Sequence, residues 1–408
     1  MTIKEAFSTA PDRGSRDRFR SFLYQTALDV YTLVGTRLAP QRAPYMPGMP
    51  IRVEGFHGEI LGIGETARQF HRALEQAGHP VERLSIDRRL RPDTAPEGAG
   101  LLRLSHLNPD QLLEYAMRVA TPNERRAPHV GYWVWELPAA PGHWRAAARL
   151  VDRIWAPSRF AADAIEAVLP DGRSVDVLPP PVFAHGTEAA PPRIDDAGEA
   201  VRILAVCDLR SSAARKNPMG ALEAFDMARE RGAEAARLVL KITAGDQCPD
   251  VLSQLAARVA DRADITLIDQ PLSDGGMLGL IAACDIALCL HRSEGFGLLA
   301  AHAAYRGKPV IATNWSAPTE FLTAEGAGLV DYTLVPVEDP QGIYPPGQMW
   351  AEPDTAHAAD WLVRLTGDAA LRDEMGRRAG RDARARLGPE AWQTRLSELL
   401  DGLPGPAA

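Results

Sequence analysis

The period of apolar and polar positions changes repeatedly along the chain from residue 51 onward. Short runs rich in Val, Ile and Leu alternate with longer segments in which apolar residues recur every three or four positions. The first pattern is typical of buried strands and the second of helices. In the first half, the predicted strands are 51–56, 81–86, 101–106, 130–135, 153–156 and 174–179. The helical patterns between them include 63–77, 141–150 and 158–168.

A linker separates this series from a second one. Residues 179–200 are rich in proline, glycine and acidic residues and show little periodicity. The strands predicted after it are 202–207, 237–244, 264–269, 285–290 and 308–313. Helices again lie between the strands, and three more are predicted at about 355–366, 369–386 and 389–402. The two halves share no internal sequence repeat, so their expected similarity is one of architecture only.

Strand–helix alternation predicts parallel sheets with helices on both faces. The expected fold class is therefore α/β, with two doubly wound, Rossmann-like domains that face a cleft. Ligands of such sheets bind beyond the carboxyl ends of the strands. Candidate site residues should consequently follow strands rather than precede them.

Residues 13–42 form a predicted amphipathic helix of unusual charge. Its apolar residues share one stripe, and six arginines against Asp17 and Asp29 give it a net charge of +4. A basic amphipathic helix can bind an anionic membrane surface. The alternative is a helix packed on its own domain, with its arginines merely solvated.

Composition and charge narrow the classes of function. The formal net charge of −8 over 408 residues argues against a nucleic-acid-binding protein. The four cysteines include no C-x-x-C pair, which argues against a disulfide framework or a zinc site and indicates a reducing cytoplasm. We recognise no signal peptide, and no apolar run is long enough to span a bilayer.

Three loops that follow predicted strands carry candidate chemistry. The first contains Gly58, Gly62 and Gly64 just before a helix, where free amides can bind phosphate, although a tight turn without a ligand is an equal alternative. The second contains Arg210, Arg215 and Lys216 before a helix that begins at about Pro218. Cations in this position suit a diphosphate, whereas isolated basic turns are more often only solvated.

The third loop, 293-SEGFGL-298, opens a helix expected at about 297–306. Its two glycines expose backbone amides, and Glu294 can accept hydrogen bonds from sugar hydroxyls or can act only as a capping acid. His302 lies one turn beyond Leu298 on the same helix face. A single histidine on an alanine-rich helix is most often a core residue.

Taken together, several segments resemble a known family. They are G-I-G-E-T-A-R (62–68), V-G-Y-W-V-W-E-L-P (130–138), I-W-A-P-S-R-F (154–160), R-K-N-P (215–218), H-R-S-E-G-F-G-L (291–298), G-K-P-V-I-A-T-N-W-S (307–316) and W-A-E-P-D (350–354). In this order they resemble the retaining glycosyltransferases of family 4 (group 1), which have the GT-B fold. The resemblance covers roughly residues 50–402. It implies an N-terminal acceptor-side domain of residues 43–185 plus 388–408 and a nucleotide-sugar-binding domain of residues 198–387.

The resemblance implies transfer of a sugar from a nucleotide-sugar, with retention and without a metal or another cofactor. Arg215 and Lys216 correspond to the cations on the donor diphosphate, and Glu294 corresponds to the first acid of the E-x7-E pattern. Further donor-binding positions are Gly62, Ile63, Gly64, Arg210, Gly295, Phe296, Gly297 and Leu298. The proposal usual for the family is front-face attack, in which the departing phosphate takes the acceptor proton.

This chain departs from the pattern at the second acid, which is His302. That acid commonly binds the nucleotide ribose, and an imidazole can accept or donate a hydrogen bond but supplies no carboxylate. We expect weaker donor binding, by roughly 1.5–3 kcal/mol if nothing replaces the acid. His302→Glu is then expected to leave activity intact or to tighten donor binding.

Candidates on the acceptor side are His106, Asn108, Asp110, Trp135 and Glu136, with Glu136 preferred as a catalytic residue. A core role is an equal alternative for the neighbouring Trp133. The predicted function is a hexosyltransferase that uses a UDP- or GDP-linked donor and acts on a glycolipid or polysaccharide intermediate. The predicted location is the cytoplasm, at the inner face of the cell membrane if residues 13–42 bind lipid. The rival hypothesis is a non-catalytic GT-B protein that binds a nucleotide or a partner; nothing in the sequence supports a GT-B epimerase or phosphorylase.

Overall fold

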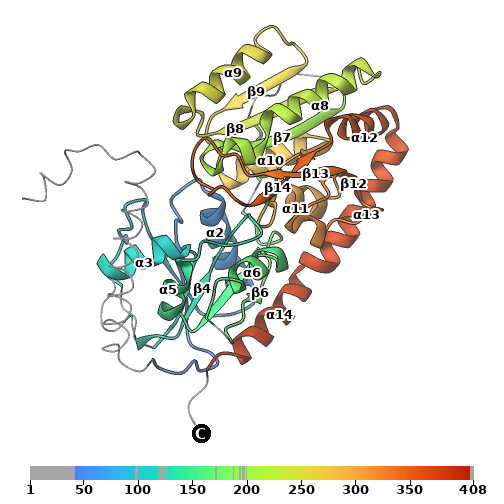
Figure 1. The fold of residues 1–408 in the computed structure, drawn as a ribbon. Coiled ribbons are helices and arrows are strands. Elements are labelled where there is room, and N and C mark those ends of the chain that lie inside the picture. Colours follow the sequence, from blue (N-terminus) through green and yellow to red (C-terminus); the bar gives the residue numbers. More distant parts are fainter. Residues whose placement is uncertain are drawn as a thin grey trace, which may run out of the picture.

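A computed structural model describes residues 42–96, 100–118, 124, 126–170, 172–186, 188–192, 194, 198 and 200–404 (Figure 1). The predicted amphipathic helix lies outside these residues except for Arg42. The described chain forms two six-stranded sheets and one two-stranded sheet. In the six-stranded sheets all described strand pairs are parallel, and the helices pack around them. The α/β prediction is therefore confirmed.

The first sheet has the strand order β2-β1-β3-β4-β5-β6. Its strands are β1 (Ile51–Gly55), β2 (Val81–Ser85), β3 (Leu102–Ser105), β4 (His129–Tyr132), β5 (Arg153–Ala156) and β6 (Asp176–Val177). Its helices are α2 (Gly62–Gln76), α3 (Pro109–Arg118), α5 (Trp144–Ala147), η2 (Ala148–Leu150) and α6 (Arg159–Glu166). The central strands β1, β3 and β4 are buried at every residue. Their buried charges are paired, because Glu54 contacts both Arg52 and Arg103 at 2.8 Å.

The second sheet has the order β12-β11-β10-β7-β8-β9. Its strands are β7 (Arg202–Asp208), β8 (Arg237–Thr243), β9 (Ile265–Asp269), β10 (Ile286–Cys289), β11 (Val310–Thr313) and β12 (Ala327–Val330). Its helices are η3 (Leu209–Ser211), α7 (Ala213–Lys216), α8 (Pro218–Glu230), η4 (Gly245–Gln247), α9 (Pro249–Val259), α10 (Asp274–Ala283), α11 (Leu298–Tyr305) and η5 (Ala317–Glu320). Within the described chain this sheet contains every strand that the sequence predicts for the second half, and β12 in addition.

The two strand orders place a switch point in each sheet. In the first sheet β1 lies between β2 and β3, and in the second β7 lies between β8 and β10. At such a point the connections on either side run to opposite faces of the sheet, which leaves a crevice at the carboxyl ends of the strands. The loops after β1 and β3 and those after β7 and β10 therefore border the natural ligand position of each sheet.

A hairpin of β13 (Tyr332–Pro336) and β14 (Met349–Pro353) was not predicted. Its residues Val337, Tyr344 and Trp350 pack into the hydrophobic cluster of the first half, which also contains Trp133 and Trp144. Figure 1 shows this hairpin and its connecting loop between the two sheets. The hairpin thus follows the second sheet in sequence but contributes to the core of the first.

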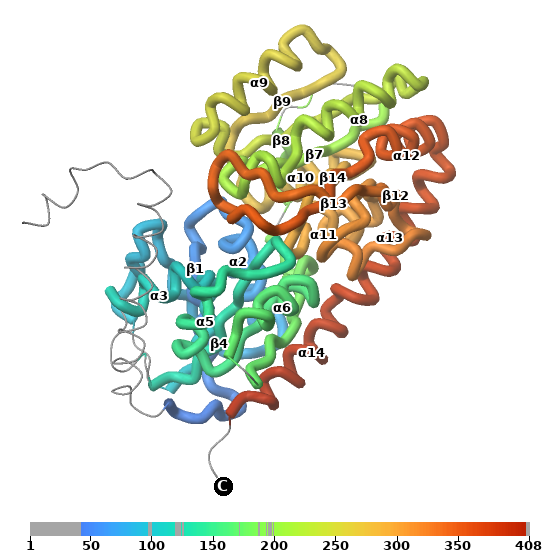
Figure 2. The backbone as a smooth tube through the Cα atoms, viewed as in Figure 1, coloured from blue at the N-terminus to red at the C-terminus, as the bar shows by residue number. Residues whose placement is uncertain are grey.

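Three helices end the described chain, namely α12 (Thr355–Gly367), α13 (Ala369–Leu387) and α14 (Pro389–Asp401). Figure 2 shows α13 and α14 following one side of the molecule, so that α14 lies beside the first sheet. Trp392 of α14 packs edge-on against Phe70, with the ring centroids 5.6 Å apart, and its Nε1 donates to the carbonyl of Pro179 at 3.0 Å. The return of the terminal helix to the first half is therefore fixed by a buried indole.

All four cysteines carry free thiols, and burial raises the pKa of Cys207 and Cys284 to about 12. These thiols are therefore protonated at neutral pH and behave as small apolar side chains. Among the helices that the structure describes, none combines the length and the apolar character needed to cross a bilayer.

Candidate functional site

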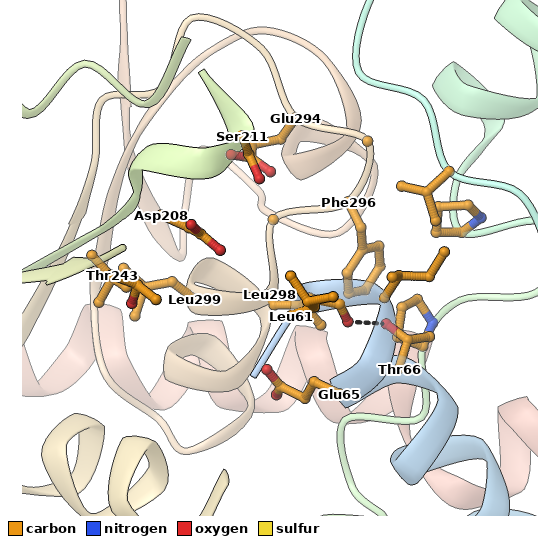
Figure 3. A pocket seen from close by; sticks show the side chains of 18 of the residues that line it. Leu61, Glu65, Thr66, Asp208, Ser211, Thr243, Glu294, Phe296, Leu298 and Leu299 are labelled. Carbon is orange, nitrogen blue, oxygen red and sulfur yellow. Dashed lines mark hydrogen bonds between the residues drawn. The ribbon is translucent and has the colours of Figure 1, made fainter. Parts of the chain in front are cut away.

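A cavity of about 370 Å³ lies between the two halves, at the carboxyl ends of both sheets. The loops that follow β1, β3 and β4 line one wall, and the loops that follow β7, β8 and β10 line the other. Figure 3 shows Glu65 and Thr66 on one side of this cavity and Asp208, Thr243 and Glu294 on the other. The cavity therefore occupies the position that the strand orders predict for a ligand.

Glu294 and two cations form the charged centre of the second wall. Glu294 Oε1 lies 2.5 Å from Lys216 Nζ and 3.0 Å from Arg215 Nη1. The two cations come from the short helix α7, and Glu294 comes from the loop between β10 and α11. Three residues distant in sequence are thus brought together because β7 and β10 are neighbours in the sheet.

Local caps hold α7 in this position. Ser212 has a positive φ of 68°, and its side chain accepts a hydrogen bond from the amide of Arg215 at 3.1 Å. Asn217 ends α7 in the left-handed region, with φ of 50°, and its Oδ1 accepts from Gly220 at the start of α8. Its Nδ2 also donates to the carbonyl of Leu290 at 3.1 Å. The turn that carries the cations is therefore fastened to the loop that carries Glu294.

The electrostatics of this centre favour the charged forms. Burial alone would raise the pKa of Glu294, but Lys216 and Arg215 outweigh it and hold the pKa well below its ordinary value. Burial would lower the pKa of Arg215, yet Tyr344, Glu294 and Glu136 raise it. Both groups are consequently ionised at neutral pH. The arrangement can present cations to a phosphate and a carboxylate to a hydroxyl group.

The start of α11 supplies backbone amides beside this centre. Gly297 is its N-terminal cap with φ of 91°, a conformation that favours glycine, and the first amides of a helix have no partner within it. Gly295 approaches the other half closely, because a Cβ atom at this position would lie 2.6 Å from the carbonyl oxygen of Trp135. Gly295, Phe296, Gly297 and Leu298 all line the cavity.

The glycine-rich loop of the first half faces these amides. Gly62 and Ile63 line the cavity, but Gly64 does not. A Cβ atom on Gly64 would lie 2.5 Å from the carbonyl oxygen of Phe56, so this glycine allows close packing of α2 on the preceding loop. Arg210 also lines the cavity, and Asp208 neutralises it through contacts of 3.0 and 2.8 Å.

Three of the acceptor-side candidates do not line the cavity, which corrects the expectation that they face it. His106 is completely buried between Phe70 and Tyr132, and this burial lowers its pKa to about 3. Trp135 packs against Trp144 and Tyr344 and donates to the carbonyl of Ala139. Asp110 is bonded to His143 and to the indole of Trp144. The strands end before these residues, and the chain turns them into the core or away from the cleft.

Glu136 and Asn108 do line the cavity. Glu136 Oε2 accepts a hydrogen bond from the Tyr344 hydroxyl at 3.0 Å, and its Oε1 lies 3.9 Å from Arg215 Nη2. Asn108 accepts from the amide of Val134. Sequence reasoning missed Tyr344, whose ring also lies 5.6 Å from the guanidinium of Arg215. No motif marks this tyrosine, because the hairpin loop brings it to the site from a distant part of the chain.

His302 is buried, and its Nε2 lies 3.0 Å from Oε1 of Glu65 in α2. Both residues line the cavity. Sequence reasoning identified His302 but missed Glu65, although this acid stands within the G-I-G-E-T-A-R segment. Glu65 lies in the first turn of a helix that follows a glycine-rich loop, and this position could have marked it as a candidate.

Comparisons with known proteins agree with this architecture. Residues 200–344 match the family model described as glycosyl transferases group 1. No curated protein matches the chain significantly in sequence. The structure of Anabaena HepE in complex with UDP and glucose is similar, with a TM-score of 0.59 and 15% identity over 87% of this chain and 100% of that one.

Two further solved structures are similar in fold. Sucrose-phosphate synthase from Thermosynechococcus elongatus has a TM-score of 0.58 and 16% identity over 86% of this chain and 98% of that one. A TarM variant from S. aureus, in complex with fondaparinux, α-GlcNAc-glycerol and UDP, has a TM-score of 0.53 and 11% identity. The TarM match covers 74% of this chain and 56% of TarM. The chain thus has the two-sheet GT-B fold, and residues 200–344 of its second half match the glycosyl transferases group 1 model.

Proposed function

We propose that the chain is a retaining glycosyltransferase that moves a hexose from a nucleotide-sugar to an acceptor hydroxyl without a metal ion. The observation that carries the proposal is the ionised Glu294 with Arg215 and Lys216, beside the amides of α11, in the cavity between the sheets. The similar HepE structure contains UDP and glucose, which supports a UDP-linked donor. A GDP-linked donor has the same diphosphate, so Arg215 and Lys216 would bind it in the same way.

The chemistry assigned to each group follows from its charge. Breaking the bond between the sugar and the diphosphate leaves negative charge on the departing phosphate. Arg215 and Lys216 stabilise this charge because they are already oriented, with side chains only 2% and 15% exposed. Glu294 accepts hydrogen bonds from hydroxyls of the donor sugar and keeps both cations in place. In front-face attack, the departing phosphate takes the acceptor proton, so no protein nucleophile is required.

The acceptor is proposed to enter from the side of Glu136. This carboxylate lines the cavity and is fixed by the Tyr344 hydroxyl, so it can orient the attacking hydroxyl group. A glycolipid or polysaccharide intermediate is the proposed acceptor. A lipid-linked acceptor also fits the proposal that residues 13–42 bind an anionic membrane surface from the cytoplasmic side.

A panel of UDP- and GDP-sugars, read by mass spectrometry, tests the proposed function. The expected result is slow hydrolysis of one donor, and its faster consumption when an acceptor is supplied. Absence of turnover with every donor, together with no thermal shift by UDP or GDP, overturns the proposal. Nucleotide binding without hydrolysis or transfer favours the non-catalytic alternative instead.

Membrane binding is tested separately by co-sedimentation with anionic liposomes. The full chain is expected to sediment with the liposomes, and a chain without residues 1–42 is expected to remain in the supernatant. If the shortened chain still sediments, the N-terminal segment is not the membrane anchor.

A further inference from the structure

Glu65 and His302 form a polar contact across the cavity to which the proposed mechanism gives no role. Glu65 lies in the first turn of α2 in the first half, and His302 lies in α11 in the second. We propose that the Glu65 carboxylate, oriented by His302, binds the ribose hydroxyls of the nucleotide in place of an acid at position 302. This inference rests on the proposed nucleotide-sugar chemistry and adds a residue that lies outside the E-x7-E pattern.

The hydrogen bonds of Glu65 leave one of its oxygens available. Oε1 accepts from Gln69 Nε2 at 3.0 Å and lies 3.0 Å from His302 Nε2. A carboxylate can only accept, so His302 Nε2 is the donor in this contact, and Nδ1 faces the Arg306 guanidinium at 3.5 Å. Gln69 Nε2 also lies 3.0 Å from His302 Nε2, but with a proton on that nitrogen it donates to Glu65 instead. Within the described part of the chain, all side-chain contacts of Glu65 fall on Oε1. The two donors therefore fix the carboxylate and leave Oε2 for a ligand hydroxyl.

The position of Glu65 suits a ribose. Figure 3 shows its side chain pointing away from α2 toward the part of the cavity beside Leu298 and Leu299. Leu298 and His302 lie one turn apart on α11, about 5–6 Å along the helix axis. The amides at the start of α11 are the proposed phosphate ligands, and the ribose is joined directly to that diphosphate. Carboxylates in dinucleotide-binding folds likewise accept from the ribose 2′-hydroxyl.

A purely structural role would have Glu65 serve only to join the two halves. Arg68 of the same helix already does this, because it contacts both carboxylate oxygens of Asp274 at 2.8 and 2.7 Å. The Glu65 side chain keeps an exposed fraction of 24%, whereas that of His302 is 3%. An acid that served only as an anchor would not need an open face on the cavity.

The inference changes the expected effect of an acid at position 302. In the wild-type chain, His302→Glu would place a second carboxylate beside Glu65, and like charges at this distance repel each other. We therefore expect this single substitution to weaken nucleotide binding. In a chain that lacks Glu65, the same substitution supplies the missing carboxylate from the opposite wall and should restore binding.

Isothermal titration with UDP and GDP, each compared with its 2′-deoxy counterpart, tests this proposal. For the nucleotide that binds wild type, loss of the 2′-hydroxyl is expected to weaken binding about tenfold or more, as a hydrogen bond to a charged group predicts. In Glu65→Ala this preference for the ribonucleotide should nearly disappear. The double variant Glu65→Ala, His302→Glu should regain it, and His302→Ala should lie in between because Glu65 is no longer oriented.

Glu75→Ala provides the matched control. Glu75 lies on the same helix α2, pairs with His71 and does not line the cavity, so this variant should keep the wild-type preference. The measured quantity is the affinity for the ribonucleotide divided by the affinity for its 2′-deoxy counterpart. A general loss of stability lowers both affinities and leaves this ratio unchanged. An unchanged ratio in Glu65→Ala, with binding retained, overturns the inference but not the proposed function. Absence of binding by both UDP and GDP to wild type overturns both.

Discussion

Glu294 keeps its charge in the cavity because the buried Arg215 and the half-buried Lys216 face the same carboxylate oxygen. The carboxylate and the two cations stabilise each other's ionised forms, so substitution of one of the three residues affects all three. Removing the carboxylate leaves Arg215 and Lys216, whose side chains are largely buried, without the carboxylate that both contact. Such a change affects the donor site and the stability of the loop together.

We expect Glu294→Gln to lower kcat/KM by at least about 100-fold, the size of effect seen when one preorganised group is removed from a transition state. Steady-state rates with the donor found in the panel provide the measurement. Glu136→Gln, on the opposite wall, is expected to act mainly through the acceptor KM. A Glu294→Gln enzyme that keeps more than about a fifth of the wild-type kcat/KM would contradict the role given to Glu294.

The buried histidine His106 gives the protein a predictable acid sensitivity. Burial lowers its pKa from 6.5 to about 3, so the unfolded chain binds a proton more readily than the folded one between these values. Above pH 6.5 the histidine is neutral in both states and does not reduce the free energy of unfolding. As the pH falls from 6.5 towards 3, protonation of the unfolded chain lowers the free energy of unfolding. For this residue alone, the loss between pH 7 and pH 5 is about 2 kcal/mol.

His106→Leu should remove that contribution, because leucine is close in volume and does not titrate. Urea unfolding at pH 7 and pH 5 is the measurement, and the variant should lose less stability between the two pH values than wild type does. His143→Leu is the control, since His143 lies partly exposed on Asp110. Equal losses in wild type and His106→Leu would mean that other buried groups dominate the acid response.

At the scale of elements, the strands were predictable because each is short and lies between helical patterns. Strands such as β8, β10 and β11 are also largely apolar and buried, whereas β2 buries only Leu84. All eleven predicted strands correspond to observed ones, from β1 to β11. The hairpin of β13 and β14 escaped prediction because most of β13 is exposed and its pattern does not alternate. Its packing into the cluster of the first half, where the ring of Tyr344 lies 5.5 Å from that of Trp135, depends on tertiary contacts that no local pattern records.

The short helix α7 depends on Asn217 for both its end and the start of α8. Asparagine tolerates the left-handed conformation found here, with φ of 50°, and its side chain caps α8 and bonds Leu290. Asn217→Ala loses the cap and strains the backbone, so we expect it to lower the free energy of unfolding by about 2–3 kcal/mol. Asn217→Gly loses the cap without the strain and should be destabilised less.

Denaturant unfolding of the two Asn217 variants measures this difference. A glycine variant that is less stable than the alanine variant would show that the left-handed conformation is not the controlling factor. Donor binding should weaken in both variants, because α7 carries Arg215 and Lys216.

At the scale of the whole molecule, the cleft was predictable from the strand alternation, whereas its contacts were not. Parallel strands bring their carboxyl ends to one edge, and this is enough to place the candidate loops at the cavity. The partner of His302, however, lies on the opposite wall and more than half the chain away in sequence. Such a pairing depends on how the two halves are apposed, which no local pattern records.

The apposition of the halves depends in part on the ion pair of Arg68 in α2 and Asp274 in α10. Both side chains are about four-fifths buried, with exposed fractions of 19% and 21%, and the contact is bidentate. Burial would raise the pKa of Asp274, but Arg68 and Arg72 outweigh it and lower the pKa. The carboxylate is therefore charged at neutral pH and holds the first helix of one half against the second half.

We expect Asp274→Asn to lower the free energy of unfolding by about 1–2 kcal/mol, because a partly buried cation loses its partner. Hydrogen exchange should also become faster in α2 and α10, while the amides of β8 keep their protection, since the change loosens the contact between halves rather than either sheet. Asp360→Asn is the matched control: it breaks the more exposed pair with Arg231 inside the second half and should change stability by less than about 0.5 kcal/mol. If α2 and α10 exchange as in wild type, the Arg68–Asp274 pair does not hold the cleft closed, and contacts such as that of Ser158 with the carbonyl of Gly295 must do so instead.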